Sequence, residues 1–309
     1  LDRTSVTDWI EADAPNLHKL TSDYAIGLMN CKTGGSDTPE NTYITIGSGV
    51  PLVAQGTSGS GFDAGEELEA GLAAQIYKQR TGHLSDPESI VQIDIARIHK
   101  LNEQSYYSIK PGTFGLVLKE ENIQTSVLGN SDSISGLRRQ AVSIAMDDMG
   151  IVSSGTVGDS ALIKDAEFPG GIRTNYENIL SRYSSLPEDV RLVVIDLGDF
   201  SRIEDARARV FDSVIERQRE QTMSRFDNFL GKLLHYIDLN NDLLIITSPT
   251  PGGETVKENN ALTPVLLAGN GVIDGLLYSP TTKRPGIIRN TDLLPTALSF
   301  MGINVPDGI

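Results

Sequence analysis

Five short apolar runs, separated by segments with helical periodicity, most constrain what this chain can fold into. Each run is rich in Leu and β-branched residues and is bounded by Gly, Asn or Asp. Such runs, apolar throughout, are typical of strands that are buried on both faces of a parallel sheet. The runs cover residues 24–29, 125–128, 192–197, 243–247 and 264–268.

The segments between these runs predict helices. Gly82, Gly150 and Gly302 stand where helices would end, and Pro39 and Pro87 stand where helices would begin. One predicted helix follows Thr38, and the others cover residues 65–80, 87–102, 135–149, 203–239 and 292–301. Strands that alternate with helices predict an α/β fold: a three-layer sandwich with a mostly parallel central sheet and helices on both faces.

We expect one domain that spans residues 1–309. Residues 56–111 have few strand signals and consist of loop and helix patterns. We therefore expect this segment to form an insertion or cap over the carboxyl edge of the sheet, where α/β sheets place their ligands.

The charge of the chain restricts its partners. It has 26 Lys and Arg against 41 Asp and Glu, a net charge of −15. This argues against nucleic acid or an anionic membrane surface as a partner, although it leaves room for a local basic pocket. Cys31 is the single cysteine, so the chain has no intrachain disulfide and no cysteine-based zinc site. No apolar run reaches the roughly 18 residues of a membrane-spanning helix.

Polar side chains follow several of the predicted strands. Asn130 and Asp132 follow the second run, Asp199 follows the third, and Thr250 follows the fourth. The carboxyl ends of parallel strands meet at one edge, so we expect Asn130, Asp132 and Thr250 to be ligand-binding candidates there. The alternative is that residues 130–132 only form a turn, since Asn, Ser and Asp are typical turn residues.

Thr38 precedes Pro39 at a predicted helix start. A hydroxyl beside the free N–H groups of a helix end is a natural phosphate site, so Thr38 is a candidate phosphate-binding hydroxyl, with Ser36 second and Asn41 as a ligand-binding candidate. The alternative is that Thr38 only caps the helix. A threonine nucleophile also needs a metal or a base, and the sequence shows neither.

Asp199 and Arg202 stand close together after the third run. An arginine near carboxylates can hold an oxyanion bidentately without a metal, which makes Arg202 an anion-binding candidate. The alternative is an ion pair between Asp199 and Arg202 that serves the following helix.

Several motifs resemble the alkaline phosphatase superfamily, which includes phosphoglycerate mutase. They are AIGLMNCKTGGSDTPENTYITIGSG, VVIDLGDFSR, LTPVLLAGNGV and TDLLPTALSFMGI. They are similar in particular to a group of bacterial membrane proteins of unassigned function, which carry this domain outside the cytoplasm with transmembrane helices after it. The resemblance implies an extracytoplasmic location, a trimmed chain, a nucleophile at Thr38, and metal-binding carboxylates at Asp2 and Asp199.

The resemblance also marks positions where metal ligands are missing. The positions of its Asp-His pair hold Pro249 and Thr250, Ile203 replaces a His, and the stretch before Thr263 holds Asn259, Asn260 and Ala261. None of the four histidines, His18, His83, His99 and His235, occupies a ligand position. Two zinc ions in this fold need about three His and three carboxylates. We therefore expect no cofactor, or a single divalent metal such as Mg²⁺ or Ca²⁺ held weakly by Asp2 and Asp199.

Two functions from different classes follow. The first is a non-catalytic extracytoplasmic domain that uses its cleft to bind an anionic small molecule, or another protein or membrane subunit. The second is a metal-dependent hydrolase of phosphate or sulfate esters, or a phosphomutase, with a reduced metal site at Asp2 and Asp199.

Overall fold

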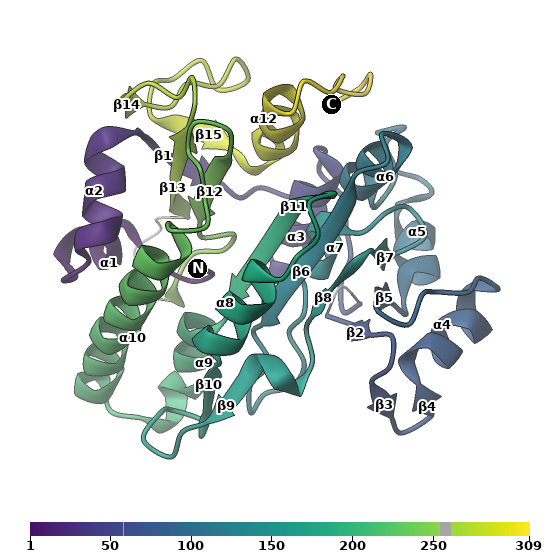
Figure 1. Ribbon diagram of the computed structural model, residues 1–309, viewed down its shortest axis with the longest axis horizontal. Helices are drawn as coiled ribbons and strands as arrows, with labels where there is room; N and C mark the ends of the chain where they lie inside the picture. Colours follow the sequence, from purple (N-terminus) through teal and green to yellow (C-terminus); the bar gives the residue numbers. More distant parts are fainter. Residues whose placement is uncertain (58, 254–260) are drawn as a thin grey trace.

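A computed structural model describes residues 1–57, 59–253 and 261–309 of the chain. It is an α/β sandwich with helices on both faces of a central sheet (Figure 1). All of the predicted strands form, and their apolar side chains pack against helices on the two faces of the sheet. They are β1 (Ala25–Asn30), β6 (Gln124–Asn130), β11 (Val190–Leu197), β12 (Leu243–Thr247) and β13 (Leu262–Gly269).

The central sheet consists of two halves. One half has the order β12-β13-β1, with the short strands β14 (Gly275–Leu276) and β15 (Ile287–Arg289) both pairing with β1. The other half is β11-β6-β8, in which β8 is Ser154–Thr156. Four of the ladders are parallel, but β13 is antiparallel to both β1 and β12. The strands β1 and β12 therefore run in the same direction.

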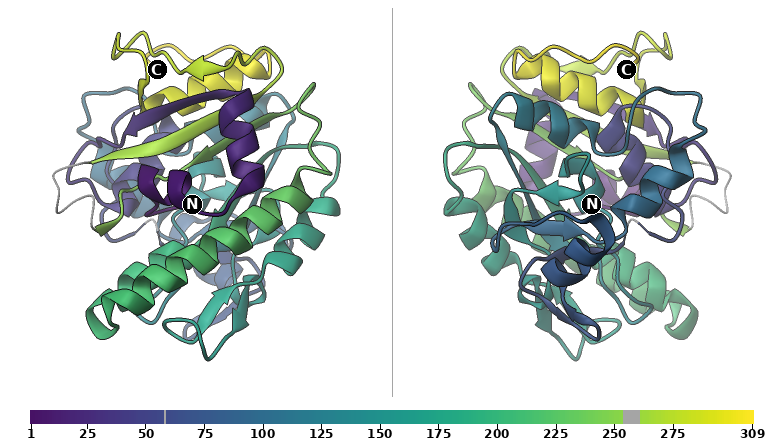
Figure 2. Two further views of the ribbon diagram at one scale, coloured as in Figure 1. Left: turned by 90° about the vertical axis from the view of Figure 1, so that its left-hand side faces the viewer. Right: turned by 90° about the vertical axis from the view of Figure 1, so that its right-hand side faces the viewer.

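One helical layer consists of α1 (Val6–Glu11), α2 (Pro15–Asp23), α8 (Tyr176–Ser184), α9 (Asp199–Ala206) and α10 (Asp212–Leu233), seen from the side in Figure 2. Its core packs Leu17, Ile179 and Phe226 against strand residues such as Leu128 and Leu266. The opposite layer consists of α3 (Pro39–Ser48), α6 (Thr113–Glu120), α7 (Val142–Ala145) and α12 (Leu293–Phe300).

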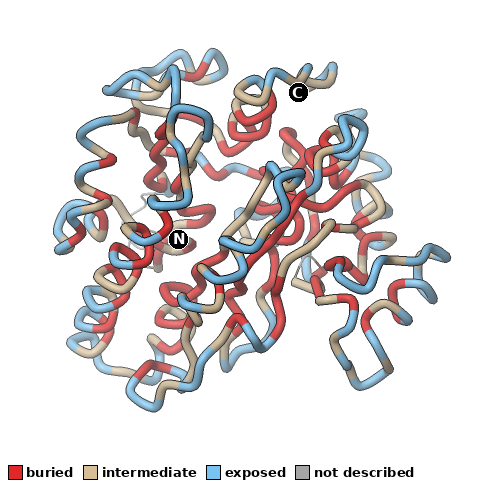
Figure 3. Tube along the Cα trace, in the orientation of Figure 1, coloured by how far each residue is buried: buried red, intermediate tan, exposed pale blue. Residues whose placement is uncertain are grey.

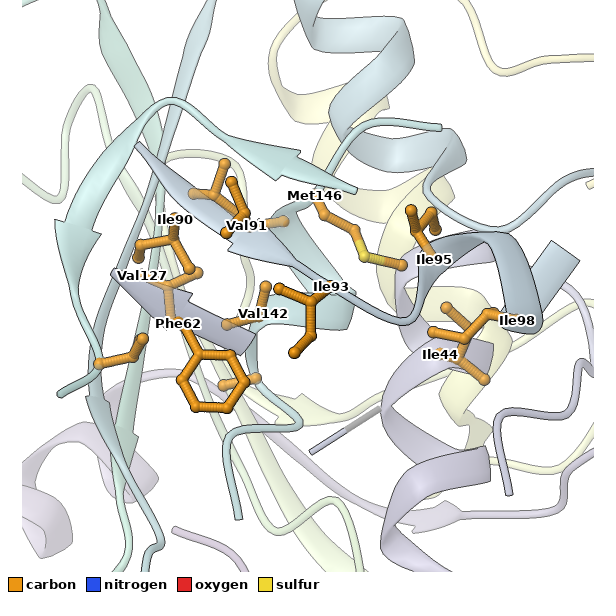
Figure 4. Packing of buried hydrophobic residues seen from close by; sticks show 14 of the residues in the cluster. Ile44, Phe62, Ile90, Val91, Ile93, Ile95, Ile98, Val127, Val142 and Met146 are labelled. Atoms are coloured by element: carbon orange, nitrogen blue, oxygen red, sulfur yellow. The ribbon is translucent and has the colours of Figure 1, made fainter. Parts of the chain in front are cut away.

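The segment 56–111 shares the core of the sheet. It contains β2 (Gly61–Asp63), β3 (Glu67–Leu68), β4 (Gly71–Leu72), α4 (Ala73–Thr81), β5 (Ile90–Gln92) and α5 (Ile95–Asn102). The strands β2 and β5 form a small antiparallel sheet with β7 (Ile151–Val152), which lies beside β8 in Figure 1. Phe62 and Ile90 pack with Ile44 and Val127 of the main body (Figure 4).

Three predicted helices are shorter in the structure than the sequence predicts. The predicted helix 65–80 begins as the β3-β4 hairpin and is helical only over α4, which ends at Gly82 in the left-handed conformation as expected. In the predicted helix 87–102, Pro87 lies in a turn, and β5 precedes α5. In the predicted helix 135–149, only α7 is α-helical, because Gly136 has a φ of 126° and Arg139 is drawn into buried ion pairs.

The long predicted helix 203–239 is interrupted. It consists of α9, which starts earlier at Asp199, a 3₁₀ turn over Arg207–Arg209, and α10, which ends at Leu233. Val210 is the break, since its φ of −131° and ψ of 144° are extended. Apolar periodicity continues across the break, which is why the sequence alone predicts a single helix.

Cys31 follows β1 and is buried beneath the sheet. Its Sγ lies 3.2 Å from Oγ1 of Thr263 in β13. Burial raises the pKa of the Cys31 thiol to about 12. Among the described residues, no helix combines the length and the apolar character needed to cross a bilayer.

Candidate functional site

The carboxyl ends of β1, β6, β11 and β12 lie at one edge of the sheet. The amino nitrogen of Leu1 donates to the carbonyl of Thr247 at the end of β12, at 3.0 Å. The same amino group interacts electrostatically with Asp196 near the end of β11. The two strands therefore end at the same place and run in the same direction. This edge holds the sequence-predicted Asp2, Asn130, Asp132, Asp199 and Thr250.

Asp2 and Thr250 lie together. Oδ1 of Asp2 accepts hydrogen bonds from the backbone N–H of Thr250 at 2.7 Å and from its Oγ1 at 2.5 Å. Ser201 Oγ donates to the other oxygen at 3.4 Å, and the Tyr43 phenol also bonds to this carboxylate. Burial, reinforced by the charges of Asp2 and Asp196, raises the Tyr43 pKa, so Tyr43 remains a donor. Asp2 thus ties the amino end of the chain to the loop after β12.

Asp199 and Arg202 form the ion pair of the alternative interpretation, and both are fully buried. Oδ1 of Asp199 accepts from Arg202 Nη1 at 2.8 Å and from the N–H and Oγ1 of Thr174 at 2.7 and 3.0 Å. Oδ2 accepts from the Tyr176 hydroxyl at 3.0 Å. Burial and the Asp199 charge raise the Tyr176 pKa. Both oxygens of this carboxylate therefore accept hydrogen bonds from protein donors.

Arg202 has no donor left for an external anion. Its Nε donates to the carbonyl of Asp132 at 2.7 Å, and Nη2 donates to the carbonyl and the Oδ1 of Asn130 at 2.6 and 3.0 Å. Nη1 donates to Asp199 and to Thr174 Oγ1. A guanidinium has five N–H donors, and all five are used. The side chain is 1% exposed, so the geometry fits the alternative interpretation, an internal ion pair.

A second buried arginine, Arg139, holds Asp132. Its Nε donates to Asp132 Oδ2 at 2.8 Å, and its Nη1 donates to Glu66 at 2.7 Å. Burial lowers the pKa of Arg139, but the two carboxylates more than offset this and raise it overall. The sequence shows no signal for this role, since Arg139 lies in a segment with helical periodicity. Through Glu66, the segment 56–111 reaches the carboxyl edge.

Asp196 is a buried carboxylate that the sequence analysis missed. Ser131 Oγ lies 3.0 and 3.1 Å from its two oxygens. Burial raises the pKa of Asp196 to about 6; the Leu1 ammonium opposes this rise, and the Asp2 charge adds to it. The sequence did carry a signal for this residue, because Asp196 lies inside the apolar run 192–197. A carboxylate in a buried strand is costly unless it is hydrogen-bonded or paired, so its presence there indicates a special environment.

Thr38 begins α3 as predicted, but its side chain makes no capping bond. Among the described residues, its buried Oγ1 has no hydrogen-bond partner. Asn41 holds two loops together: its Nδ2 donates to Ser36 O at 2.9 Å and its Oδ1 accepts from Ala54 N at 2.8 Å. Asn130 likewise bonds within the protein, donating to the carbonyls of Val157 and Gly158.

The donor set does not fit a binuclear metal centre. Within the part of the chain that the structure describes, no three His, Cys, Asp or Glu side chains come together in a way that could hold a metal. The rings of His18, His99 and His235 bond instead to backbone carbonyls, and His83 lies in an exposed turn after α4. Asn259 and Asn260 lie outside the described residues. Asp2 and Asp199 belong to separate hydrogen-bond networks. The acidic residue that interacts electrostatically with Asp2 is Asp196.

Solved structures with a similar fold are known, although no family model and no curated protein matches the sequence. The PH0037 protein of Pyrococcus horikoshii is 15% identical with a TM-score of 0.56, over 100% of this chain and 96% of that one. An alkaline phosphatase superfamily protein of Vibrio parahaemolyticus is 11% identical with a TM-score of 0.53, over 99% of this chain and 65% of that one.

A mutant alkaline phosphatase of the Antarctic bacterium TAB5, which has Mg bound in its M3 site, is 11% identical with a TM-score of 0.51. The match covers 98% of this chain and 96% of that one. The chain therefore has the fold of the alkaline phosphatase superfamily. At these identities the likeness is one of fold, and the activity must be argued from the residues of this chain.

Proposed function

We propose that this chain is a non-catalytic binding domain with an alkaline phosphatase fold, and that it forms the extracytoplasmic part of a bacterial membrane protein. In this proposal residues 1–309 act as one domain whose ligand is a partner protein or an anionic molecule. The observation that carries the proposal is the internal pairing at the carboxyl edge. Asp199 forms an ion pair with Arg202, and Asp132 forms an ion pair with Arg139.

This pairing removes what ester hydrolysis requires. Hydrolysis on this fold needs an activated hydroxyl and positive charge that is directed at the transition state. No base lies within hydrogen-bond reach of the Thr38 hydroxyl among the described residues. Arg202 and Arg139 at this edge are 1% and 2% exposed, and both are already bound to carboxylates.

A partner protein is favoured over a small anion. An anion at the edge would meet the carboxylates of Asp2 and Asp196, on a chain whose net charge is −15. The arginines described near this edge, Arg3, Arg138, Arg139 and Arg202, are each bound to a carboxylate of the protein. Apolar side chains offer an alternative surface near β14, where Ile273, Leu276 and Tyr278 are 79%, 63% and 62% exposed. Tyr278 also lines a cavity of about 640 Å³ beside α12. Exposed apolar groups gathered in this way mark interaction surfaces.

Metal content and hydrolysis test the proposal together. The purified chain, dialysed without chelator, is analysed for zinc and magnesium and then assayed on aryl phosphate, phosphodiester and sulfate substrates with and without added divalent metal. We expect less than one equivalent of metal, and rates that Thr38→Ala does not change. Two equivalents of zinc, or hydrolysis that Thr38→Ala abolishes, would overturn it.

The second candidate is an ester hydrolase or phosphomutase with a reduced metal site. It is favoured by the Asp2–Asp196 pair and by the unpartnered Thr38 hydroxyl. On this alternative Asp196, rather than Asp199, would be the second carboxylate for a Mg²⁺ or Ca²⁺ ion. Calorimetric titration with Mg²⁺ separates the two candidates, since binding that Asp196→Asn removes supports the enzyme, whereas the absence of binding to the parent supports the binding domain.

The extracytoplasmic location rests on the sequence resemblance. Protease treatment of intact spheroplasts that express the natural full-length protein tests it. The domain should be degraded while a cytoplasmic control protein survives, and a protected domain would contradict the assignment.

A further inference from the structure

Exposed tyrosine and aliphatic side chains gather at the amino edge of the sheet, opposite the carboxyl edge. The strand β14 pairs with the first two residues of β1, whereas β1 ends on the carboxyl edge. After β14 the chain forms a loop that closes where Gly286 N donates to Leu277 O at 2.7 Å. Figure 1 shows β14 and this loop at the top of the molecule, and Figure 3 shows the loop as mostly exposed. This end of the molecule therefore points away from the candidate site.

Two aliphatic and three tyrosine side chains form the apolar surface of this end. Ile273 follows the turn after β13, and Leu276 belongs to β14. Tyr278 and Tyr107 line the same cavity of about 640 Å³, and the ring of Tyr106 packs edge-on against Tyr107 with 5.6 Å between the ring centroids. Tyr106 is 96% exposed, and Ile273, Leu276 and Tyr278 are likewise exposed. An apolar surface of this kind marks a contact with a protein or a membrane.

Basic side chains stand beside this apolar surface. A Cβ placed on Gly286 would lie 3.6 Å from the side chain of Leu276, so Leu276 packs beside the loop that carries Lys283 and Arg284. Both basic side chains are exposed, and among the described residues neither takes part in an ion pair. Residues 270–289 contain three basic residues and one acidic residue, Asp274, although the whole chain has a net charge of −15. This segment therefore has the opposite charge to the rest of the molecule.

The net charge of the chain does not prevent this segment from approaching an anionic surface. At physiological ionic strength, exposed charges that are separated by more than about 8 Å are largely screened. Only the charges at the end that touches the surface then act on it, and here these are mainly basic. The charge of −15 instead restricts which end can approach, because the other surfaces would be repelled.

We propose that this end is a membrane-contact face, which rests on the head groups of an anionic bilayer. Ile273 and Leu276 enter the boundary between head groups and acyl chains, and Tyr278 lies at the level of the head groups with its hydroxyl towards water. Lys283 and Arg284 pair with lipid phosphates. The inference deepens the proposed function and rests on its membrane attachment. It assigns the surface near β14 to the bilayer and leaves the carboxyl edge to a partner protein, because that edge then faces away from the lipid.

Two observations favour a bilayer over a partner protein at this face. Ile273 and Leu276 lie in a turn and in a strand of only 2 residues, so they can enter a fluid surface but present little regular backbone for a partner to pair with. Tyrosines beside lysine and arginine are typical of membrane interfaces, whereas protein interfaces are depleted in lysine. A chain attached to a membrane also meets the lipid at a high effective concentration, so a small face is enough.

Vesicle binding by the purified chain tests the proposal. The vesicles consist of phosphatidylcholine alone, or of phosphatidylcholine with an equal amount of phosphatidylglycerol, and the bound fraction is measured by sedimentation at about 0.15 M and about 1 M salt. The charge variant is Lys283→Glu with Arg284→Glu. Its control is Lys78→Glu with Lys164→Glu, which changes the net charge equally at exposed sites in α4 and in β9 (Leu162–Lys164).

A second pair of variants tests the apolar contact. The apolar variant is Ile273→Ser with Leu276→Ser. Its control is Ile10→Ser with Phe211→Ser, which removes two side chains, in α1 and just before α10, that are 69% and 85% exposed. Because all four positions are exposed, neither variant should disturb the fold.

We expect the parent to bind vesicles with phosphatidylglycerol at least about fivefold better than phosphatidylcholine alone, and to bind less at high salt. The charge variant should bind about tenfold less than its control, and the apolar variant about fivefold less than its control. No binding by the parent would overturn the proposal, as would equal binding by either variant and its control. It would also fall if the parent formed a dimer on size-exclusion chromatography that the variants of this face abolished, because the occupant would then be a second copy.

These results are independent of metal content and of hydrolysis. A chain that hydrolyses esters and still binds vesicles through this face would contradict only the absence of catalysis. A chain without hydrolysis that binds no vesicles would contradict only the membrane-contact face.

Discussion

At the scale of single residues, Arg202 shows how a group suited to binding a ligand can serve the fold instead. Its guanidinium donates to the carbonyls of Asn130 and Asp132 and to the side-chain oxygen of Asn130, all in the loop after β6. It also pairs with Asp199 at the start of α9, so Arg202 joins this loop to the helix. Removal of one partner from a buried ion pair leaves the other charge uncompensated, which costs far more than the pair contributes when intact.

Arg202→Ala should therefore lower the free energy of unfolding by about 3–5 kcal/mol. Urea denaturation followed by circular dichroism measures this. The matched control is Arg173→Ala, which breaks the half-exposed pair with Asp165 and should cost less than about 1 kcal/mol. If Arg202→Ala instead left stability unchanged and removed binding of inorganic phosphate, Arg202 would be an anion ligand after all.

Asp196 gives the chain a pH dependence of known sign. Burial raises its pKa from 3.8 to about 6, so the folded state holds the proton more tightly than the unfolded state. The contribution of Asp196 to stability should therefore fall as pH rises from about 4 to about 6. Asn cannot ionise, so Asp196→Asn should be more stable than the parent at pH 8, by of the order of 2–3 kcal/mol, with no advantage near pH 4. Urea denaturation of the parent and of Asp196→Asn from pH 4 to pH 8 measures this difference in stability. A difference that is the same at every pH would contradict the raised pKa of Asp196.

At the scale of elements, the contact between α3 and α7 depends on a residue without a side chain. A Cβ on Gly47 would lie 2.1 Å from the carbonyl oxygen of Ser143. Backbone on both sides leaves no flexible side chain to move aside. The close approach of these helices, which carry Tyr43 and Val142 into the same apolar core, thus requires glycine.

Gly47→Ala should cost about 3 kcal/mol or more, because the two helices must separate. Gly65→Ala is the control: nothing lies within 4 Å of its added Cβ, and its effect should stay within about 0.5 kcal/mol. Thermal unfolding of both variants compares them, and equal melting temperatures would show that α3 can shift freely.

Elements with strong local signals were the ones that the sequence could predict. The apolar runs found the main strands, and the Pro and Gly positions found the start of α3 and the end of α4. Helix 135–149 failed because the ion pairs of Arg139 with Asp132 and Glu66, distant in the chain, override local periodicity. The contacts at the carboxyl edge could not be predicted for the same reason, since no local pattern reveals that all donors of Arg202 are used or that Asp196 lies near Asp2.

At the scale of the whole molecule, the carboxylates of the edge are held by arginines, hydroxyls and amides. A ligand that binds the folded state raises its stability in proportion to its affinity and concentration. Exhaustive treatment with EDTA should therefore change the melting temperature by less than about 1 °C. A fall of several degrees, reversed by zinc or magnesium, would show that a bound metal contributes to the fold.

The reactivity of Cys31 reports how often one half of the sheet opens. Thiol reagents attack the thiolate, and a thiol with a pKa of about 12 supplies almost none at neutral pH. Buried beside Thr263, it becomes reactive only when β1 and β13 part. Because it is the single cysteine of the chain, the rate at which a coloured disulfide reagent is consumed counts these openings directly, without any engineered label.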